Sequence, residues 1–157
     1  MVSVLRPAAN LGLWALALSI APSVCAEAGE TFRWDQLTVV TSSGQSRSFR
    51  IEVAETPRQR VQGLQLRRGL ESGDGMLFDF EVVQPVAMWM KNTFVSLDML
   101  FIAADGRILN IARGTTPLSL ATIASAGPVR GVLEIRAGTA NRLGIKAGDM
   151  VQYPIFQ

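Results

Sequence analysis

The fold is decided by three neighbouring apolar segments, Gly75-Met-Leu-Phe-Asp-Phe80, Met88-Trp-Met-Lys-Asn-Thr93 and Leu97-Asp-Met-Leu-Phe-Ile102. Polar residues interrupt them at Lys91, Asn92 and Asp98. A buried charge is costly unless it is paired or hydrogen-bonded. The segments therefore predict either a functional site or a structural ion pair in the middle of the core.

The N-terminus has the pattern of a secretory signal peptide. Arg6 precedes a short apolar segment, residues 11–20, and Val24-Cys25-Ala26 fits a cleavage site. We expect cleavage after Ala26, a leader over residues 27–34 and one domain over residues 35–157. Lipidation of Cys25 is the first alternative, and an uncleaved anchor is the second. Export would place the protein in the periplasm or outside the cell, with contact to the membrane only through the signal peptide.

Composition excludes several chemistries. The chain has no histidine, and its one cysteine lies in the predicted signal peptide. This excludes an imidazole-based triad, a cysteine nucleophile and a Cys/His zinc site from the domain. Cleavage would leave 14 basic against 13 acidic residues, mostly scattered, so the sequence predicts no nucleic-acid partner. No cofactor is expected.

Periodicity predicts about eight short strands and two short helices. Alternating residues indicate strands over 36–41, 48–54 and 86–91, and 97–102 is apolar on both faces, as in a central strand covered on both sides. Further short strands are expected over 76–80, 108–112, 132–135 and 150–155. Thr56-Pro57-Arg58-Gln59 is a capping box that begins a helix reaching to about Arg68. A second helix begins at Gly138-Thr139 and ends at Gly144, and residues 114–128 are expected to form a long loop. The predicted fold class is α+β: one compact domain, mostly antiparallel, with a curved or barrel-like sheet.

The order of short motifs resembles the DUF192 family, also called UPF0127. The motifs are Gly63-Leu64 with Arg67, Gly75-Met-Leu-Phe78, Trp89-Met-Lys-Asn-Thr93, Leu97-Asp98 with Phe101, Val132-Leu-Glu134 with Ala137-Gly138, and Gly148-Asp149. The resemblance covers roughly residues 49–151. It implies a compact, mostly β fold in a family of small, often exported bacterial and archaeal proteins of unknown function.

The candidate binding residues are Trp89, Lys91, Asn92, Thr93 and Asp98. A lysine ammonium beside Trp89 can bind an anion or an acidic ligand, with hydrogen bonds from Asn92 and Thr93. The alternative is that Lys91 pairs with Asp98 across adjacent strands and only fixes their register.

The candidate catalytic residues are Asp98 and Glu134, two carboxylates within apolar strands. Together around a cleft they could hydrolyse a glycosidic bond. The ordinary alternative for Glu134 is a bond to a backbone amide or to an arginine such as Arg136. Met88 and Met90 share one strand face and are weak candidates for Cu(I), although methionine is also an ordinary core residue.

The sequence therefore favours an exported, non-enzymatic protein that binds a small ligand or a protein partner near Trp89, Lys91, Asn92 and Asp98, beside residues 114–128. A hydrolase or lyase using Asp98 and Glu134 is the first alternative. A structural or stress-related accessory protein without a pocket is the second.

Overall fold

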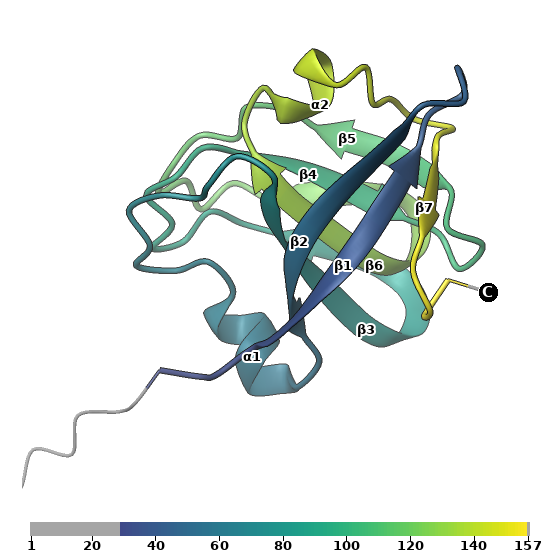
Figure 1. The fold of residues 1–157 in the computed structure, drawn as a ribbon. Helices are drawn as coiled ribbons and strands as arrows, with labels where there is room; N and C mark the ends of the chain where they lie inside the picture. Colours follow the sequence, from purple (N-terminus) through teal and green to yellow (C-terminus); the bar gives the residue numbers. More distant parts are fainter. Residues whose placement is uncertain (1–28, 157) are drawn as a thin grey trace, which may run out of the picture.

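Seven strands and two short helices make up the domain (Figure 1). The computed structural model describes residues 29–156. In chain order the elements are β1 (Arg33–Val40), β2 (Ser46–Ala54), α1 (Pro57–Gln62), β3 (Asp74–Met88), β4 (Leu97–Ile102), β5 (Ile108–Ala112), β6 (Ile123–Arg136), α2 (Thr139–Arg142) and β7 (Met150–Gln152).

The strands form one sheet in the order β5-β4-β6-β3-β2-β1-β7. All neighbouring pairs are antiparallel except β2 and β3, which are parallel and joined through α1. The edges meet where the Val151 amide donates to the Gly106 carbonyl at 2.7 Å and Arg107 pairs with Met150. Gly106 has a φ of +84°, and a Cβ there would lie 2.5 Å from the Val151 carbonyl oxygen, so only glycine allows this closure. The predicted α+β domain with a barrel-like sheet is confirmed.

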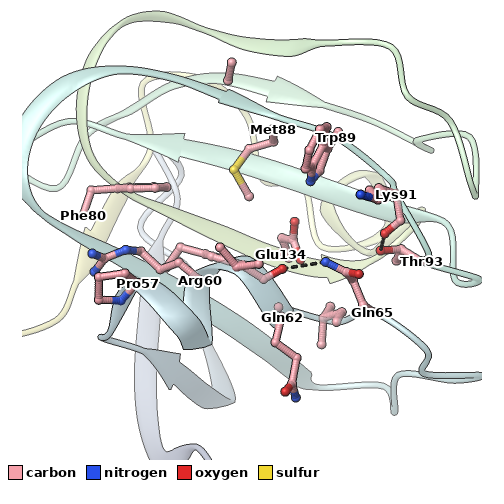
Figure 2. Close-up of a pocket in the computed structure, with 15 residues that line it drawn as sticks. Pro57, Arg60, Gln62, Gln65, Phe80, Met88, Trp89, Lys91, Thr93 and Glu134 are labelled. Carbon is pink, nitrogen blue, oxygen red and sulfur yellow. Dashed lines mark hydrogen bonds between the residues drawn. The ribbon is translucent and has the colours of Figure 1, made fainter. Parts of the chain in front are cut away.

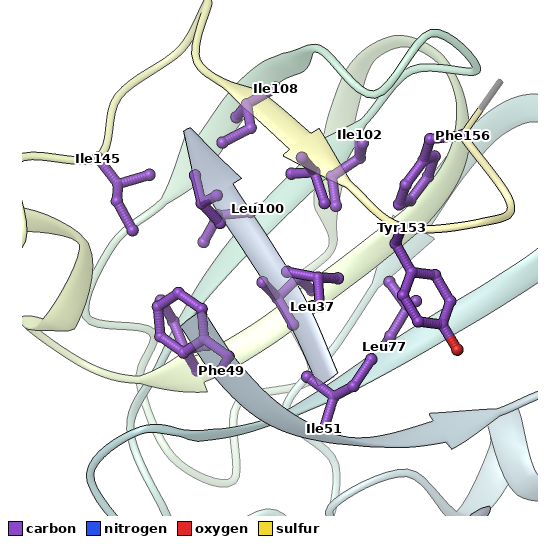
Figure 3. Packing of buried hydrophobic residues seen from close by; sticks show 14 of the residues in the cluster. Leu37, Phe49, Ile51, Leu77, Leu100, Ile102, Ile108, Ile145, Tyr153 and Phe156 are labelled. Carbon is purple, nitrogen blue, oxygen red and sulfur yellow. The ribbon is translucent and has the colours of Figure 1, made fainter. Parts of the chain in front are cut away.

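The barrel interior holds the first hydrophobic core. Alternate residues of each strand point inward, because successive side chains of a strand face opposite sides of the sheet. Phe49, Ile51 and Val53 of β2 share this face, as the alternation predicted. Figure 3 shows Phe49 and Ile51 in one cluster with Leu77, Leu100 and the C-terminal Tyr153 and Phe156.

A second core covers the outer face of β3, β4 and β6. Leu97, Met99 and Phe101 pack there against Met76, Phe78 and Val132. Strand β4 is therefore covered on both sides, which explains why Leu97–Ile102 is apolar at every position but one. This outer face is the one that carries the site described below.

Helix α1 begins as predicted but ends earlier. Thr56 accepts from the Gln59 amide at 3.2 Å, and Gln59 accepts from the Thr56 amide at 3.0 Å. The helix ends at Gln62 instead of near Arg68, because Gly63 adopts a φ of +46°. A Cβ at Gly63 would lie 3.0 Å from the Phe78 ring, so glycine also allows the turn to pack on β3.

The predicted strand bounds need several further corrections. Residues 76–80 and 86–91 are not two complete strands, because one strand, β3, runs from Asp74 to Met88 through irregularities near Pro85. The predicted loop 114–128 is a loop only to residue 122, because residues 123–128 belong to β6 and pair with the far end of β3. Strand β1 begins at Arg33, inside the expected leader 27–34.

The N-terminal signal prediction stays outside this description. The expected signal peptide, residues 1–26, lies outside the described residues. Within residues 29–156, no helix has the length and apolar character needed to span a membrane.

Candidate functional site

A cavity of about 390 Å³ lies between α1 and the outer face of the sheet. This volume is within the usual range for small-molecule sites. Its wall is mainly apolar and comes from α1 with the turn after it, from β3, and from the residues after β3. The apolar lining residues are Pro57, Val61, Gly63, Leu64, Phe78, Phe80, Ala87, Met88 and Trp89.

The polar lining residues are Arg60, Gln62, Gln65, Lys91, Thr93 and Glu134. Figure 2 shows Glu134 in the middle of the group, with Met88 and Trp89 on one side and Gln62 and Gln65 on the other. Glu134 comes from β6, where Met76 of β3 and Met99 of β4 flank it in the register. The floor of the cavity is thus a carboxyl group between two methionines.

Glu134 differs from every other buried acid in the described chain. The five buried acidic residues of the 29–156 region are Glu52, Asp79, Asp98, Glu134 and Asp149. Four of them accept hydrogen bonds, from arginines or from backbone amides. Within these residues no group donates to the Glu134 carboxyl, and burial raises its pKa to about 8. The expected partner, a backbone amide or Arg136, is therefore absent from the part of the chain that the structure describes.

Arg60 and Gln65, two other polar residues of the cavity, already have partners. The Arg60 Nη1 donates to the carbonyls of Glu55 and Asp79, at 2.6 Å each, and to Glu81 Oε1 at 3.0 Å. The Gln65 Nε2 donates to the Val61 carbonyl at 2.5 Å, and its Oε1 accepts from Asn92. These bonds hold α1 and its turn against the sheet, so they build the wall of the cavity.

Lys91 lies at the rim of the cavity with Trp89. Its Nζ is 5.4 Å from the centroid of the Trp89 ring, within range of a cation–π interaction. Both side chains are exposed. Thr93 is buried, lines the same cavity, and donates from its hydroxyl to the Lys91 carbonyl at 3.2 Å. Trp89, Lys91 and Thr93 therefore line the same cavity.

Asn92 has a supporting position. It has a φ of +55°, a conformation that asparagine tolerates better than most residues. Its carbonyl accepts from the Leu66 amide at 2.8 Å, and its Nδ2 donates to Gln65 Oε1 at 3.1 Å. It does not line the cavity. It fastens the turn after α1 to the end of β3, which positions Gln65.

Asp98 lies elsewhere, and the structure corrects two predictions about it. Its side chain is on the barrel face of β4, beside Ile135, whereas Glu134 is on the outer face. It accepts from the Gly114 amide at 3.0 Å and from the Ala140 amide at 2.9 Å. The Lys91–Asp98 ion pair is not formed, because the two residues are on different faces. For the same reason Asp98 and Glu134 do not share a cleft.

The methionines separate in a similar way. Met88 lines the cavity, whereas Met90 is fully buried and its Sδ accepts from the Thr115 hydroxyl at 3.2 Å. The two thioethers therefore belong to different surroundings. Within the described residues, no group of three or more acidic, histidine or cysteine side chains could hold a metal ion.

Sequence reasoning missed the contribution of α1. Pro57, Arg60, Val61, Gln62 and Gln65 line the cavity, but the helix was predicted only as an element. The sequence carried one usable signal: Gly63 ends the helix early and turns Leu64 and Gln65 toward the sheet. Which sheet residue they meet depends on the β2–α1–β3 connection and cannot be read from local pattern.

The fold and the cavity define a small barrel-like protein with a mainly apolar cavity on the outer face of its sheet. Comparison with family models matches residues 38–153 to DUF192, described as an uncharacterized ACR. The chain belongs to this family.

Two solved structures are similar. A Sinorhizobium meliloti protein, described as a proposed transcription regulator, is 45% identical with a TM-score of 0.77. The match covers 80% of this chain and 97% of that one. A protein of unknown function from Novosphingobium aromaticivorans is 37% identical with a TM-score of 0.75, covering 90% and 99% of the two chains. No curated protein matches.

Proposed function

We propose that this protein binds a small molecule with an apolar body in the cavity floored by Glu134. The observation that carries the proposal is a buried carboxyl that opens into an apolar cavity and has no donor among the described residues. Because the carboxyl faces a mainly apolar cavity, it leaves a position there for a hydrogen-bond donor. A ligand that bonds to it supplies one.

The proposal favours binding over hydrolysis. Two-carboxylate hydrolysis needs a second acid on the same cleft. Glu134 is the one acid among the residues that line the cavity, since Asp98 is on the barrel face. Lys91 and Trp89 at the rim are residue types that orient a ligand as it enters.

We further propose that the protein is exported and has no nucleic-acid partner. The N-terminal signal pattern supports export. In residues 29–156, six arginines form ion pairs with acids: Arg33, Arg50, Arg60, Arg67, Arg107 and Arg130. These pairs reduce the positive surface that would attract the phosphates of a nucleic acid. We therefore do not propose a role in transcription for this chain.

Blocking the cavity tests the binding proposal. Ala87 is exposed at the cavity wall, so Ala87→Trp should fill the space without disturbing either core. Thermal unfolding of the purified protein is measured with a library of small apolar compounds. A compound present at 100 times its dissociation constant should add about 2.7 kcal/mol to the stability. The shift should disappear in Ala87→Trp.

The control is Ala126→Trp, an exposed β6 alanine that does not line the cavity. It should keep the shift. Compounds that bind both tryptophan variants equally would contradict the proposed cavity, and a library without any binder would contradict small-molecule binding.

A further inference from the structure

Two groups of opposite charge type open onto the cavity without neutralising each other. Glu134 is at the floor and Lys91 is at the rim. Neither takes part in any of the seven ion pairs found in the described chain. The remaining polar groups are engaged, because Arg60 and Gln65 bond the α1 region and the Thr93 hydroxyl donates to a carbonyl.

We infer that the ligand is an amphoteric compound of the amino-acid class, with its ammonium on Glu134, its acidic group on Lys91 and its apolar body against the cavity wall. This inference rests on the proposed function, since it assumes that the cavity binds a ligand. It adds the chemical class and the orientation.

The position of Glu134 supports an ammonium at the floor. Charge-assisted hydrogen bonds are about twice as strong as neutral ones, and surroundings of low polarity strengthen them further. A neutral ligand would leave Glu134 as a carboxylic acid and gain one ordinary hydrogen bond. A ligand ammonium would bind Glu134 as a carboxylate. It would be the hydrogen-bond partner that residues 29–156 do not supply to Glu134.

Lys91 supports an acidic group at the rim. A ligand that carried only a positive charge would enter past the Lys91 ammonium and be repelled by it. A ligand with a carboxylate at its outer end removes this repulsion and pairs with Lys91, which is exposed and free to move from the Trp89 ring. The two charges of an amino acid match the two charges of the cavity.

Binding should depend on pH in a defined direction. The charged groups around Glu134 are Arg60 from α1, Lys91 after β3, and the Glu52–Arg67 ion pair, which lies beyond Met76 on the same sheet face. Met76 and Met99, the direct neighbours, do not titrate. With the pKa of free Glu134 at about 8, an ammonium must displace a proton at neutral pH. Affinity should therefore rise roughly 50-fold between pH 6 and pH 8, with release of about one proton per ligand at the lower pH.

Two sets of four probes test the inference by calorimetry. L-phenylalanine carries both charges, 2-phenylethylamine only the ammonium, 3-phenylpropionate only the carboxylate, and 2-phenylethanol neither. The second set, with a linear apolar body, is L-norleucine, n-pentylamine, hexanoate and 1-pentanol. We expect the amphoteric member of at least one set to bind best, with loss of either charge weakening binding by 10-fold or more.

Three variants assign the charges. Glu134→Gln should weaken the two ammonium-bearing probes by 10-fold or more, abolish their pH dependence and leave the carboxylate probe unchanged. Lys91→Met should do the reverse, weakening only the carboxylate-bearing probes. Lys146→Met, the matched removal of an exposed lysine that does not line the cavity, should change nothing.

The outcomes separate the inference from the proposed function. If an alcohol binds as tightly as the amino acid, or if Glu134→Gln weakens all four probes equally, the amphoteric ligand is wrong and the cavity remains a binding site. If no probe of either set binds, both the inference and the proposed function fail. Thermal unfolding of each variant without ligand shows that a lost affinity is not a lost fold.

Discussion

Asp98 and Glu134 are two buried carboxyl groups on neighbouring strands with opposite surroundings. In the β4–β6 register Asp98 is opposite Ile135 and Glu134 is opposite Met99, so they are one position apart and on different faces. Asp98 bonds two backbone amides that belong to the loop after β5 and to α2. Glu134 faces a cavity and has no donor in residues 29–156.

The difference shows that burial alone does not identify a functional acid. Asp98 is needed where it is, because the buried Ala140 amide and the partly buried Gly114 amide would otherwise lose their acceptor. Asp149 has the same role, accepting from the amides of Ser42 and Lys146 at 2.7 and 2.8 Å. Glu134 accepts no hydrogen bond from the described chain and faces the cavity, and this is the difference on which the binding proposal rests.

The largest effect is expected for Glu134→Gln at high pH. Burial raises the pKa of Glu134 from 4.5 to about 8 in the folded protein. Between these values the folded state binds more protons than the unfolded state, so the stability of the wild type should fall as pH rises. The loss is about 1.4 kcal/mol per pH unit, up to about 5 kcal/mol above pH 8. A glutamine side chain cannot ionise, and the variant should therefore be more stable than the wild type at pH 9 and similar at pH 5.

Urea unfolding at pH 5, 7 and 9 measures this difference. The matched control is Glu71→Gln, which removes a carboxylate from an exposed position and should follow the wild type at each pH. The prediction is wrong if the stability of the wild type does not fall relative to that of Glu134→Gln between pH 5 and pH 9. Glu134 would then have a donor, and its surroundings would not differ from those of Asp98 in the way described.

Replacing the acid by its amide should lower the stability at Asp98, whereas it raises the stability at Glu134 at high pH. Asp98→Asn replaces one acceptor oxygen by an NH₂ group, which then faces a buried amide donor of Gly114 or Ala140. An unsatisfied buried donor costs about 1–3 kcal/mol, and the lost charge-assisted bond adds to this. We expect a loss of about 2–4 kcal/mol at pH 7.

Thermal or urea unfolding measures the effect of Asp98→Asn, with Asp105→Asn as the exposed control. Ligand binding in the cavity should survive in any Asp98→Asn protein that remains folded. If a folded Asp98→Asn variant lost binding, Asp98 would contribute to the binding site.

The sequence predicted the elements whose signals are local. The Thr56–Gln59 capping box predicted the start of α1. The apolar run 97–102 and the Asp105-Gly106 turn after it predicted β4 and β5 with the bounds that the structure shows. It failed where tertiary pairing overrides the local signal. Residues 123–128 are small residues without alternation, yet they extend β6 because the far end of β3 pairs with them. Pro85 suggested a new strand but lies at an irregularity within β3, where proline is tolerated.

The candidate site likewise has a part that follows from local sequence and a part that depends on tertiary contacts. Trp89, Lys91 and Thr93 lie close together along the chain, so their convergence could be inferred from one segment. Glu134 was recognised as a buried carboxylate, but whether it has a partner depends on strands β3 and β4 and on α1. Asp98 was the more prominent polar residue in the sequence, and its two amide partners come from segments that no periodicity connects to it.

The smallest effect is expected when a partner is removed from a paired acid. Glu52 is buried on the same sheet face as Glu134, in register with Met76, and Arg67 binds it with two hydrogen bonds. Arg67→Met leaves Glu52 without its guanidinium while keeping an apolar side chain near Phe32. Because Arg67 is partly exposed, water can replace it in part, and we expect a loss of about 1–2 kcal/mol. Arg68→Met, an exposed neighbour, should cost little.

Comparing Arg67→Met with Arg67→Met/Glu52→Gln makes this test specific. If an unpartnered buried carboxylate is costly on this face, the double variant should recover most of the stability that the single variant loses, as measured by urea unfolding at pH 7. Recovery would show that an unpartnered carboxylate is costly on this face, in agreement with the raised pKa of Glu134. A single variant as stable as the wild type would mean that the face accepts such groups freely, and Glu134 would then need no ligand to account for it.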